Sequence, residues 1–248
     1  MYQISIKNYL EKHGFEALRP KAVLFDMDGV LYNSMPNHAV AWQQSMAQFG
    51  ITMTADDAYA TEGARGVDTI RKMVMLQQGR EIDEAEAQRM YDVKSHIFHQ
   101  LPEAPIMPGI LTLMQQIHDD GIQIGVVTGS GQKPLIKRIL KDFGTFVDEA
   151  HITTAYDVRR GKPKPDPYLM GLRKAGDLMP YEAIVVENAP LGIQAGVAAK
   201  IFTIAVNTGP LSVQTLLDAN ADLLFPTMPD FSANWGKLIA TTSSSYIS

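Results

Sequence analysis

Four compact apolar runs, separated by stretches with helical periodicity, are the feature that most constrains the fold of this 248-residue chain. The runs cover residues 21–25, 122–127, 183–186 and 202–206, with shorter ones near 150–152 and 222–224. Such runs are typical of strands that are buried on both faces. Helical stretches lie between them, at residues 110–118, 134–140, 167–174 and 191–199. This alternation predicts an α/β fold with a doubly wound, Rossmann-like parallel sheet and right-handed crossovers.

One long stretch, residues 36–104, interrupts the alternation with helical patterns and without a comparable strand-like run. Its expected helices span residues 38–49, 55–61, 67–78 and 84–101. Thr54 and Asp83 are candidate N-caps, because each precedes a helix and is followed three residues later by an acid. We therefore expect an all-helical cap domain at 36–104, inserted into a catalytic core domain made of residues 1–35 and 105–248.

The borders and ends of these domains carry predictions of their own. Pro36 and the proline-rich stretch 102–109 are the expected hinges between cap and core. Residues 1–19 have the apolar spacing of a short amphipathic helix. The polar tail, residues 241–248, is expected to be disordered.

Composition limits the function classes. A net charge of -5 provides no basic field for a nucleic-acid backbone or an anionic membrane, so we expect neither partner. The absence of cysteine excludes disulfides and thiolate metal sites, so any metal is held by oxygen or imidazole, which favours Mg²⁺. No apolar run approaches a membrane span, and charges interrupt the N-terminal residues where a signal peptide needs an uncharged core. We expect a cytoplasmic monomer.

Polar residues follow several of the apolar runs. In an open parallel sheet, ligands bind in the crevice beyond the carboxyl ends of the strands. If the runs are adjacent strands, the following groups converge on one place: Asp26 and Asp28 after the first run, Thr128, Gly129 and Ser130 after the second, Lys162 in the loop 161–167, and Glu187 with Asn188 after the third. Taken singly, each group also fits a helix cap or a solvated turn. Their expected convergence favours a functional site.

Phosphoryl transfer is the chemistry that needs this set. The Asp26 carboxylate can accept the phosphoryl group and later lose it to water, which splits one difficult displacement into two. Asp28 can act as an acid toward the leaving group and then as a base toward water. Crowding two carboxylates raises the pKa of one of them, which suits a proton shuttle. A divalent cation held by Asp26 and Glu187 would offset the remaining charge.

The same motifs carry a family resemblance that covers nearly the whole chain after residue 20. DxDG after an apolar strand, Thr at a second strand end, a Lys loop and then Glu187-Asn188 resemble the haloacid dehalogenase superfamily of phosphohydrolases. The resemblance implies that Asp26 is the nucleophile and that Asp28 is the acid/base and a backbone-carbonyl ligand of Mg²⁺. It also implies that Thr128 and Lys162, with Gly129 and Ser130, bind phosphate, and that Glu187 and Asn188 complete the metal site.

Other segments resemble particular branches of this superfamily. The helical insertion directly after DxDGVL, with Ser34 and His38, is similar to the small-cap branch that contains β-phosphoglucomutase. The segments GSGQ, KPKPDPY and ENAPLGIQAG are similar to Bacteroides-type members that include an inorganic pyrophosphatase. The branch implies that Ser34, His38 and the cap residue Glu62 contact the substrate.

Two departures from the branch pattern bear on the substrate. The metal-end pair is commonly two acids, whereas Glu187-Asn188 supplies one acid and one amide, which still offers an oxygen to Mg²⁺. In the cap, Glu62 occupies the place of the lysine in the KG turn of the mutase. This acid should repel the second phosphate of a sugar bisphosphate unless a metal intervenes, and it removes the Schiff-base lysine that phosphonatases need.

The sequence therefore predicts a Mg²⁺-dependent phosphohydrolase that acts through an aspartyl-phosphate on a small phosphorylated substrate, either inorganic pyrophosphate or a sugar phosphate. β-Phosphoglucomutase is the alternative within the superfamily. A dehalogenase would need neither Asp28, Glu187 nor a metal. A catalytically silent phospho-ligand sensor is the non-enzyme alternative, although the chain retains both Asp26 and Asp28.

Overall fold

A six-stranded parallel sheet confirms the expected α/β class. The computed structural model describes residues 2–130 and 133–244. Its strand order is β3-β2-β1-β4-β5-β6, and all pairs are parallel. The strands are β1 (Ala22–Phe25), β2 (Gln123–Val127), β3 (Val147–Thr153), β4 (Ala183–Glu187), β5 (Phe202–Val206) and β6 (Leu223–Phe225). All six expected strand positions are therefore confirmed.

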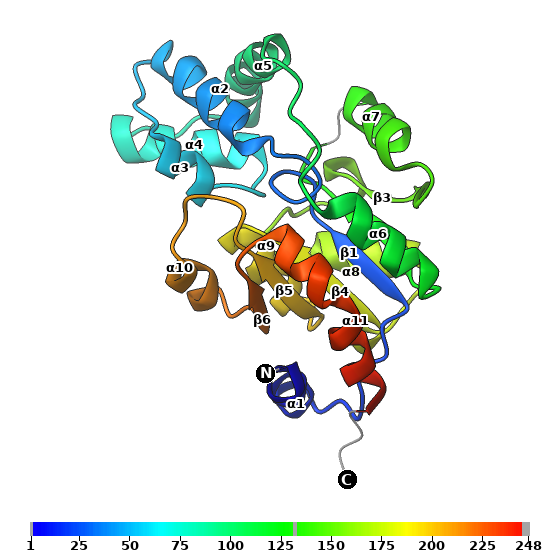
Figure 1. The fold of residues 1–248 in the computed structure, drawn as a ribbon. Helices are drawn as coiled ribbons and strands as arrows, with labels where there is room; N and C mark the ends of the chain where they lie inside the picture. Colours follow the sequence, from blue (N-terminus) through cyan, green and yellow to red (C-terminus); the bar gives the residue numbers. More distant parts are fainter. Residues whose placement is uncertain (1, 131–132, 245–248) are drawn as a thin grey trace.

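Both faces of this sheet are covered, as continuous apolar strands require. Because side chains alternate along a strand, Val23 and Phe25 pack into one apolar cluster while Ala22 and Leu24 pack into another. The first cluster lies under α1 (Tyr2–His13), α6 (Ile110–Asp119), α7 (Lys133–Phe143) and α11 (Met228–Ser244), and the second lies under α8 (Asp166–Lys174) and α9 (Pro190–Ala198). Figure 1 shows the sheet between these helices.

Four further helices, which we call the cap helices, lie above the carboxyl ends of the strands in Figure 1. They are α2 (Met35–Ala47), α3 (Ala55–Ala60), α4 (Gly66–Gln78) and α5 (Glu84–Gln100), and they share an apolar cluster of their own. Both expected N-caps are confirmed: Thr54 forms a capping box with Asp57, and the Asp83 side chain accepts a hydrogen bond from the backbone N–H of Glu86. The assignment of residues 36–104 as a separate domain stays a prediction.

Several expected boundaries are wrong. The N-terminal helix ends at His13 rather than near residue 19, because Gly14 adopts φ +70 and turns the chain. Pro36 lies in the first turn of α2, where its fixed φ and missing N–H are tolerated, and its role as a hinge stays a prediction. The polar tail is helical as far as Ser244, and residues 245–248 lie outside the described residues. Helix α10 (Val213–Asp218) and most of α11 were not expected.

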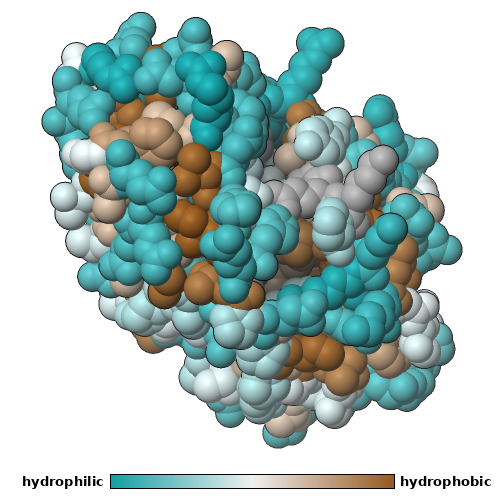
Figure 2. Space-filling view, turned by 90° about the horizontal axis from the view of Figure 1, so that it is seen from above, coloured by the Kyte–Doolittle hydropathy of each residue, from teal (hydrophilic) through white to brown (hydrophobic). Residues whose placement is uncertain are grey.

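The surface seen from the side of the cap helices is mainly polar. Figure 2 shows hydrophilic side chains over most of this face, with apolar residues in separate groups. Among the described residues, no helix combines the length and the apolar character that crossing a membrane requires.

Candidate active site

The carboxyl ends of the three central strands bring the expected site residues together. Phe25 of β1 pairs with Val126 of β2 and with Val186 of β4, so the residues that follow these strands lie side by side. The backbone N–H of Asp26 donates to the Val186 carbonyl at 3.0 Å and extends the pairing by one residue. Asp26 therefore lies between the strand ends that carry Thr128 and Glu187.

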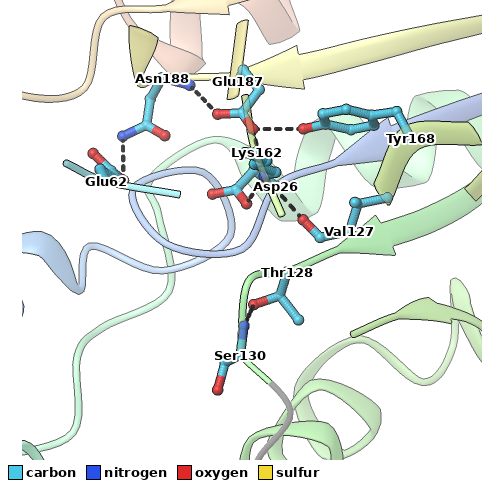
Figure 3. Close-up of polar contacts among 9 residues, drawn as sticks. All are labelled: Asp26, Glu62, Val127, Thr128, Ser130, Lys162, Tyr168, Glu187 and Asn188. Atoms are coloured by element: carbon cyan, nitrogen blue, oxygen red, sulfur yellow. Dashed lines mark hydrogen bonds and ion pairs between the residues drawn. The ribbon is translucent and has the colours of Figure 1, made fainter. Parts of the chain in front are cut away.

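Lys162 is the centre of a buried ionic network (Figure 3). Its Nζ donates to Asp26 Oδ1 at 2.5 Å and to Glu187 Oε1 at 2.6 Å. It also donates to the Val127 carbonyl at 3.2 Å, and Tyr168 OH donates to Glu187 Oε1 at 2.6 Å. The side chains of Lys162 and Glu187 are each 1% exposed, so these contacts are shielded from solvent and its ions. The sequence correctly placed Lys162 beside the acids, although its loop is far from them along the chain.

Burial and neighbouring charges set the ionisation of this network. Burial raises the pKa of Asp26, Lys162 partly counteracts this, and the charges of Glu187 and Asp28 raise it further. Burial alone would lower the pKa of Lys162, but the carboxylates of Asp26 and Glu187 outweigh burial and raise it. Lys162 is therefore a permanent cation that holds Asp26 in position and limits its protonation.

Asp28 belongs to a second network, which leads into the cap helices. Ser34 Oγ donates to Asp28 Oδ1 at 2.6 Å, and His38 Nε2 lies 3.1 Å from the same oxygen. Lys94 Nζ lies 2.7 Å from His38 Nδ1. Because an ammonium has no acceptor, Nδ1 must accept from Lys94, which leaves the imidazole proton on Nε2, directed at Asp28. Asp28 thus receives two hydrogen bonds on one oxygen.

These hydrogen bonds give Asp28 the opposite titration behaviour to Asp26. Burial disfavours ionisation of Asp28, but His38, Ser34 and Lys94 outweigh it and lower its pKa to about 2. Burial and the charge of Lys94 lower the pKa of His38, Asp28 partly counteracts this, and burial lowers the pKa of Lys94 to about 8. Crowding was expected to produce one raised pKa that suits the proton shuttle. The raised pKa instead falls on Asp26, because only Asp28 has donors on the cap side.

Glu62 reaches from the cap helices to the core. Asn188 Nδ2 donates to Glu62 Oε1 at 2.9 Å, and both side chains are buried. Burial and the charge of Asp26 raise the pKa of Glu62 well above its ordinary range. Gly29 is required at this point for two reasons: its φ is +75, and a Cβ there would lie 2.0 Å from Asn188 Nδ2. The glycine of the DxDG motif thus lets Asn188 approach the catalytic loop.

The end of β2 carries the remaining expected residues. Thr128 Oγ1 accepts a hydrogen bond from the Ser130 backbone N–H at 3.0 Å, which fixes the turn beside Asp26 in Figure 3. The backbone of Gly129 closely approaches the cap, since a Cβ there would lie 3.3 Å from the Gly63 carbonyl oxygen. Gly131 and Gln132 of the expected GSGQ turn lie outside the described residues.

A cavity of about 80 Å³ lies between the cap helices and these strand ends. At ~10–15 Å³ of such space per water molecule, it holds roughly five to eight waters. Of the expected site residues, Asp26, Asp28, His38, Glu62, Gly129 and Ser130 line it. The other expected residues are not among those lining it: Ser34 contacts Asp28, and Lys162 contacts Asp26 and Glu187, while Asn188 contacts Glu62 and Thr128 contacts the Ser130 backbone. The cavity is smaller than the ~300–1,000 Å³ usual for small-molecule sites, so the cap lies close to the core.

The oxygen donors fit a hard divalent cation. Asn188 Oδ1 and Glu62 Oε2 are buried without a hydrogen-bond partner, beside the carboxylates of Asp26 and Glu187. Buried polar atoms are normally satisfied, so two orphaned oxygens close to two carboxylates favour a cation. The described residues contain no group of three acidic or imidazole side chains that could hold a metal ion by themselves, so a cation here would also need the Asn188 amide or a backbone carbonyl.

Sequence reasoning missed two residues of the site, Lys94 and Tyr168. Lys94 is 4% exposed, and its Nζ lies 4.9 Å from the centre of the Phe98 ring and 5.1 Å from that of Trp42. The one sequence feature that could have indicated a role for Lys94 is its spacing from Tyr91 and Phe98, which places the three residues on one side of α5. Tyr168 lies in the KPKPDPY segment, but a tyrosine that follows prolines does not indicate a hydrogen bond between its hydroxyl and Glu187.

Comparisons with known proteins identify the family of the chain. The family model described as hydrolase, haloacid dehalogenase-like hydrolase, matches residues 20–200. Hexitol phosphatase A of Escherichia coli is 33% identical over 190 residues, covering 77% of this chain and 84% of that protein. β-Phosphoglucomutase of Bacillus subtilis is 28% identical over 198 residues, covering 76% and 84%. A solved structure from Bacteroides vulgatus, described as a candidate β-phosphoglucomutase, is 46% identical with a TM-score of 0.93, covering 97% of this chain and 98% of that one.

Proposed function

Because the chain belongs to the haloacid dehalogenase-like hydrolases, we propose that it is a Mg²⁺-dependent phosphohydrolase that acts through an aspartyl-phosphate at Asp26. The observation that carries the proposal is the buried placement of Asp26 against Lys162 and Glu187, with Asp28 beside it in the same cavity. A carboxylate that is held by a lysine and opens onto a cavity is placed to attack a phosphorus atom.

The chain's own residues divide the reaction into two steps. In the first, an Asp26 oxygen forms a bond to phosphorus while the bond to the leaving group breaks. In the second, Asp28 accepts a proton from water, the water oxygen attacks phosphorus, and the bond to Asp26 breaks to release phosphate. The backbone around Thr128 and Ser130 holds the phosphoryl oxygens. Lys162, whose three N–H donors contact Asp26, Glu187 and the Val127 carbonyl, holds Asp26 in position.

Mg²⁺ would be held by Asp26, Glu187, Asn188 and the Asp28 backbone carbonyl, where it neutralises charge on the phosphoryl group. Its donor set contains two carboxylates, which is sufficient for a cation that also binds phosphate oxygens.

For the substrate we infer pyrophosphate or another small phosphoanhydride first, and a sugar monophosphate second. An Asp28 held ionised by Ser34 and His38 is a poor acid, and a phosphate leaving group needs a proton less than a sugar alkoxide does. The small cavity and the acidic Glu62 also disfavour a substrate with a second, uncomplexed phosphate on a sugar. Hexitol phosphatase A and β-phosphoglucomutase among the relatives support sugar phosphates as the second class.

The proposal is tested by phosphate release with Mg²⁺ from pyrophosphate, β-glucose 1-phosphate, hexitol phosphates and nucleotides at equal concentration. We expect turnover of at least one compound, with the pyrophosphate rate at least about tenfold above every ester. Conversion of β-glucose 1-phosphate to glucose 6-phosphate without net phosphate release would instead establish a mutase. No turnover on the whole panel would contradict the enzyme proposal and favour a phospho-ligand sensor.

Replacing Glu62 by lysine should change substrate preference. The change places a cation where an acid now contacts Asn188, so we expect the ratio of pyrophosphate to sugar bisphosphate turnover to fall by about tenfold or more. Glu62→Gln keeps the size and the hydrogen bond and serves as the matched control. The same panel, with a sugar bisphosphate added, measures both variants, and an unchanged profile for Glu62→Lys would remove Glu62 from substrate recognition.

A further inference from the structure

A second groove borders the 61–64 turn of the cap and does not include Asp26 or Asp28. Its volume is about 440 Å³, and it lies between α4 of the cap helices and the core loop that carries Lys162. The cap contributes Arg65 and Lys72, and the core loop contributes Arg159, Arg160 and Lys164. The only acid among its lining residues is Asp68.

This concentration of cations is unusual for a chain with a net charge of -5. Lys162 also lines the groove, where it is paired with Asp26 and Glu187. Two of the other five cations are neutralised, because Arg65 pairs with Glu84 at 3.1 Å and Arg160 pairs with Asp166 at 2.9 Å. The other three, Lys72, Arg159 and Lys164, are exposed and form no hydrogen bond or ion pair with any described side chain. Asp57 and Asp166 lie close enough to Lys72 and Lys164 to interact electrostatically, but neither contacts them.

The groove lies where the cap and the core loop meet. Its two walls meet at two glycines: a Cβ on Gly161 would lie 2.8 Å from Arg65 Cγ, and a Cβ on Gly63 would lie 3.2 Å from Lys162 Cδ. When the walls meet in this way, cations of the cap face cations of the core. Like charges repel most strongly within a Debye length of about 8 Å. The cations on the two walls therefore oppose the contact between cap and core unless an anion lies between them.

We propose that this groove binds a small multivalent anion with at least two phosphate-like groups, and that the bound anion stabilises the closed cap. Arginine and lysine donors at fixed positions suit phosphate oxygens, and two groups are needed to reach both walls. The closed volume and the overall negative charge favour a compact anion over a polymer. Because Glu62 follows Thr61 of the same turn, the anion acts on the contact between Glu62 and Asn188 without entering the cavity at Asp26.

The test is a calorimetric titration of methylenediphosphonate into the full chain, in buffer without divalent cations. Methylenediphosphonate resembles a diphosphate but cannot be hydrolysed. We expect saturable binding that weakens about tenfold or more in Lys72→Glu, from the cap wall, and in Arg159→Glu, from the core wall. Lys237→Glu removes an exposed cation on α11 and should change the affinity less than twofold. Undiminished binding in either groove variant would overturn the proposal.

Hydrogen exchange separates this groove from the site at Asp26 and tests closure. With methylenediphosphonate present, we expect slower exchange of the backbone amides at 61–66 and at 159–164 together, and no such slowing in Arg159→Glu. Protection confined to residues 26–31 and 128–130 would show that the anion binds beside Asp26, and protection of one wall alone would show that it does not bridge. Either outcome overturns the proposal but leaves the proposed phosphohydrolase intact, because no turnover is measured.

Discussion

Asp26→Asn is expected to lower turnover by at least about 10⁴-fold while the protein stays folded, because an amide cannot accept the phosphoryl group. Its melting temperature should be unchanged or higher. Burial and the charges of Glu187 and Asp28 already disfavour the ionised form of Asp26, so a neutral side chain of the same shape relieves repulsion. Lys162 keeps its ion pair with Glu187 at 2.6 Å.

Asp177→Asn is the matched control for this substitution. Asp177 is exposed, has φ +54, which asparagine tolerates, and lies on the turn after α8. It should retain the activity and circular dichroism of the wild type. Activity of Asp26→Asn within a few-fold of the wild type would exclude Asp26 as the nucleophile.

Lys162→Met is expected to lose both activity and stability. Methionine has about the same side-chain volume as lysine. The substitution leaves the carboxylates of Asp26 and Glu187 buried without their cation. Breaking a buried ion pair in this way lowers the free energy of unfolding by about 3–5 kcal/mol. Urea unfolding at pH 8 measures this loss. In the double variant Lys162→Met/Asp26→Asn one orphaned charge is removed, so we expect part of the stability to return.

The loss in Lys162→Met should also depend on pH. Lys162 holds down the pKa of Asp26, so its removal raises that pKa further above the value in the unfolded chain. The folded state then binds more protons than the unfolded state, and stability rises as the pH falls from 8 toward 5. The control is Lys174→Met, whose ion pair with Asp157 is partly exposed, at 24% and 28% for the two side chains, and is worth about 1 kcal/mol or less. A Lys162→Met protein as stable at pH 8 as Lys174→Met would contradict the buried network.

The elements that could be predicted from the sequence are those that a local pattern determines. Apolar runs located all six strands, and the order of polar residues at their ends placed Asp26, Lys162 and Glu187 together. Helix α11 was missed because Gly236 and two threonines, Thr241 and Thr242, weaken its intrinsic propensity. Packing of Phe231, Trp235 and Leu238 stabilises it instead.

The titration of the two aspartates could not be predicted from their spacing. Their spacing implies that each ionised carboxylate disfavours ionisation of the other, but it does not show which of the two accepts hydrogen bonds. Lys94, 66 positions after Asp28, orients His38 toward Asp28 through a contact between α5 and α2. Only the tertiary structure brings these groups together, and it makes Asp28 the acid that stays ionised.

The most direct test of the account is detection of a phosphoryl group on Asp26. Asp28→Asn should be mixed with acetyl phosphate and Mg²⁺, quenched in acid, digested and analysed by mass spectrometry. Acetyl phosphate has a leaving group that needs no proton, so transfer to Asp26 persists, while hydrolysis slows because the base toward water is missing. We predict one hydroxylamine-labile phosphoryl group on the peptide that contains Asp26, and none in Asp26→Asn. A phosphoryl group on another residue, or equal labelling without Asp26, would contradict the account.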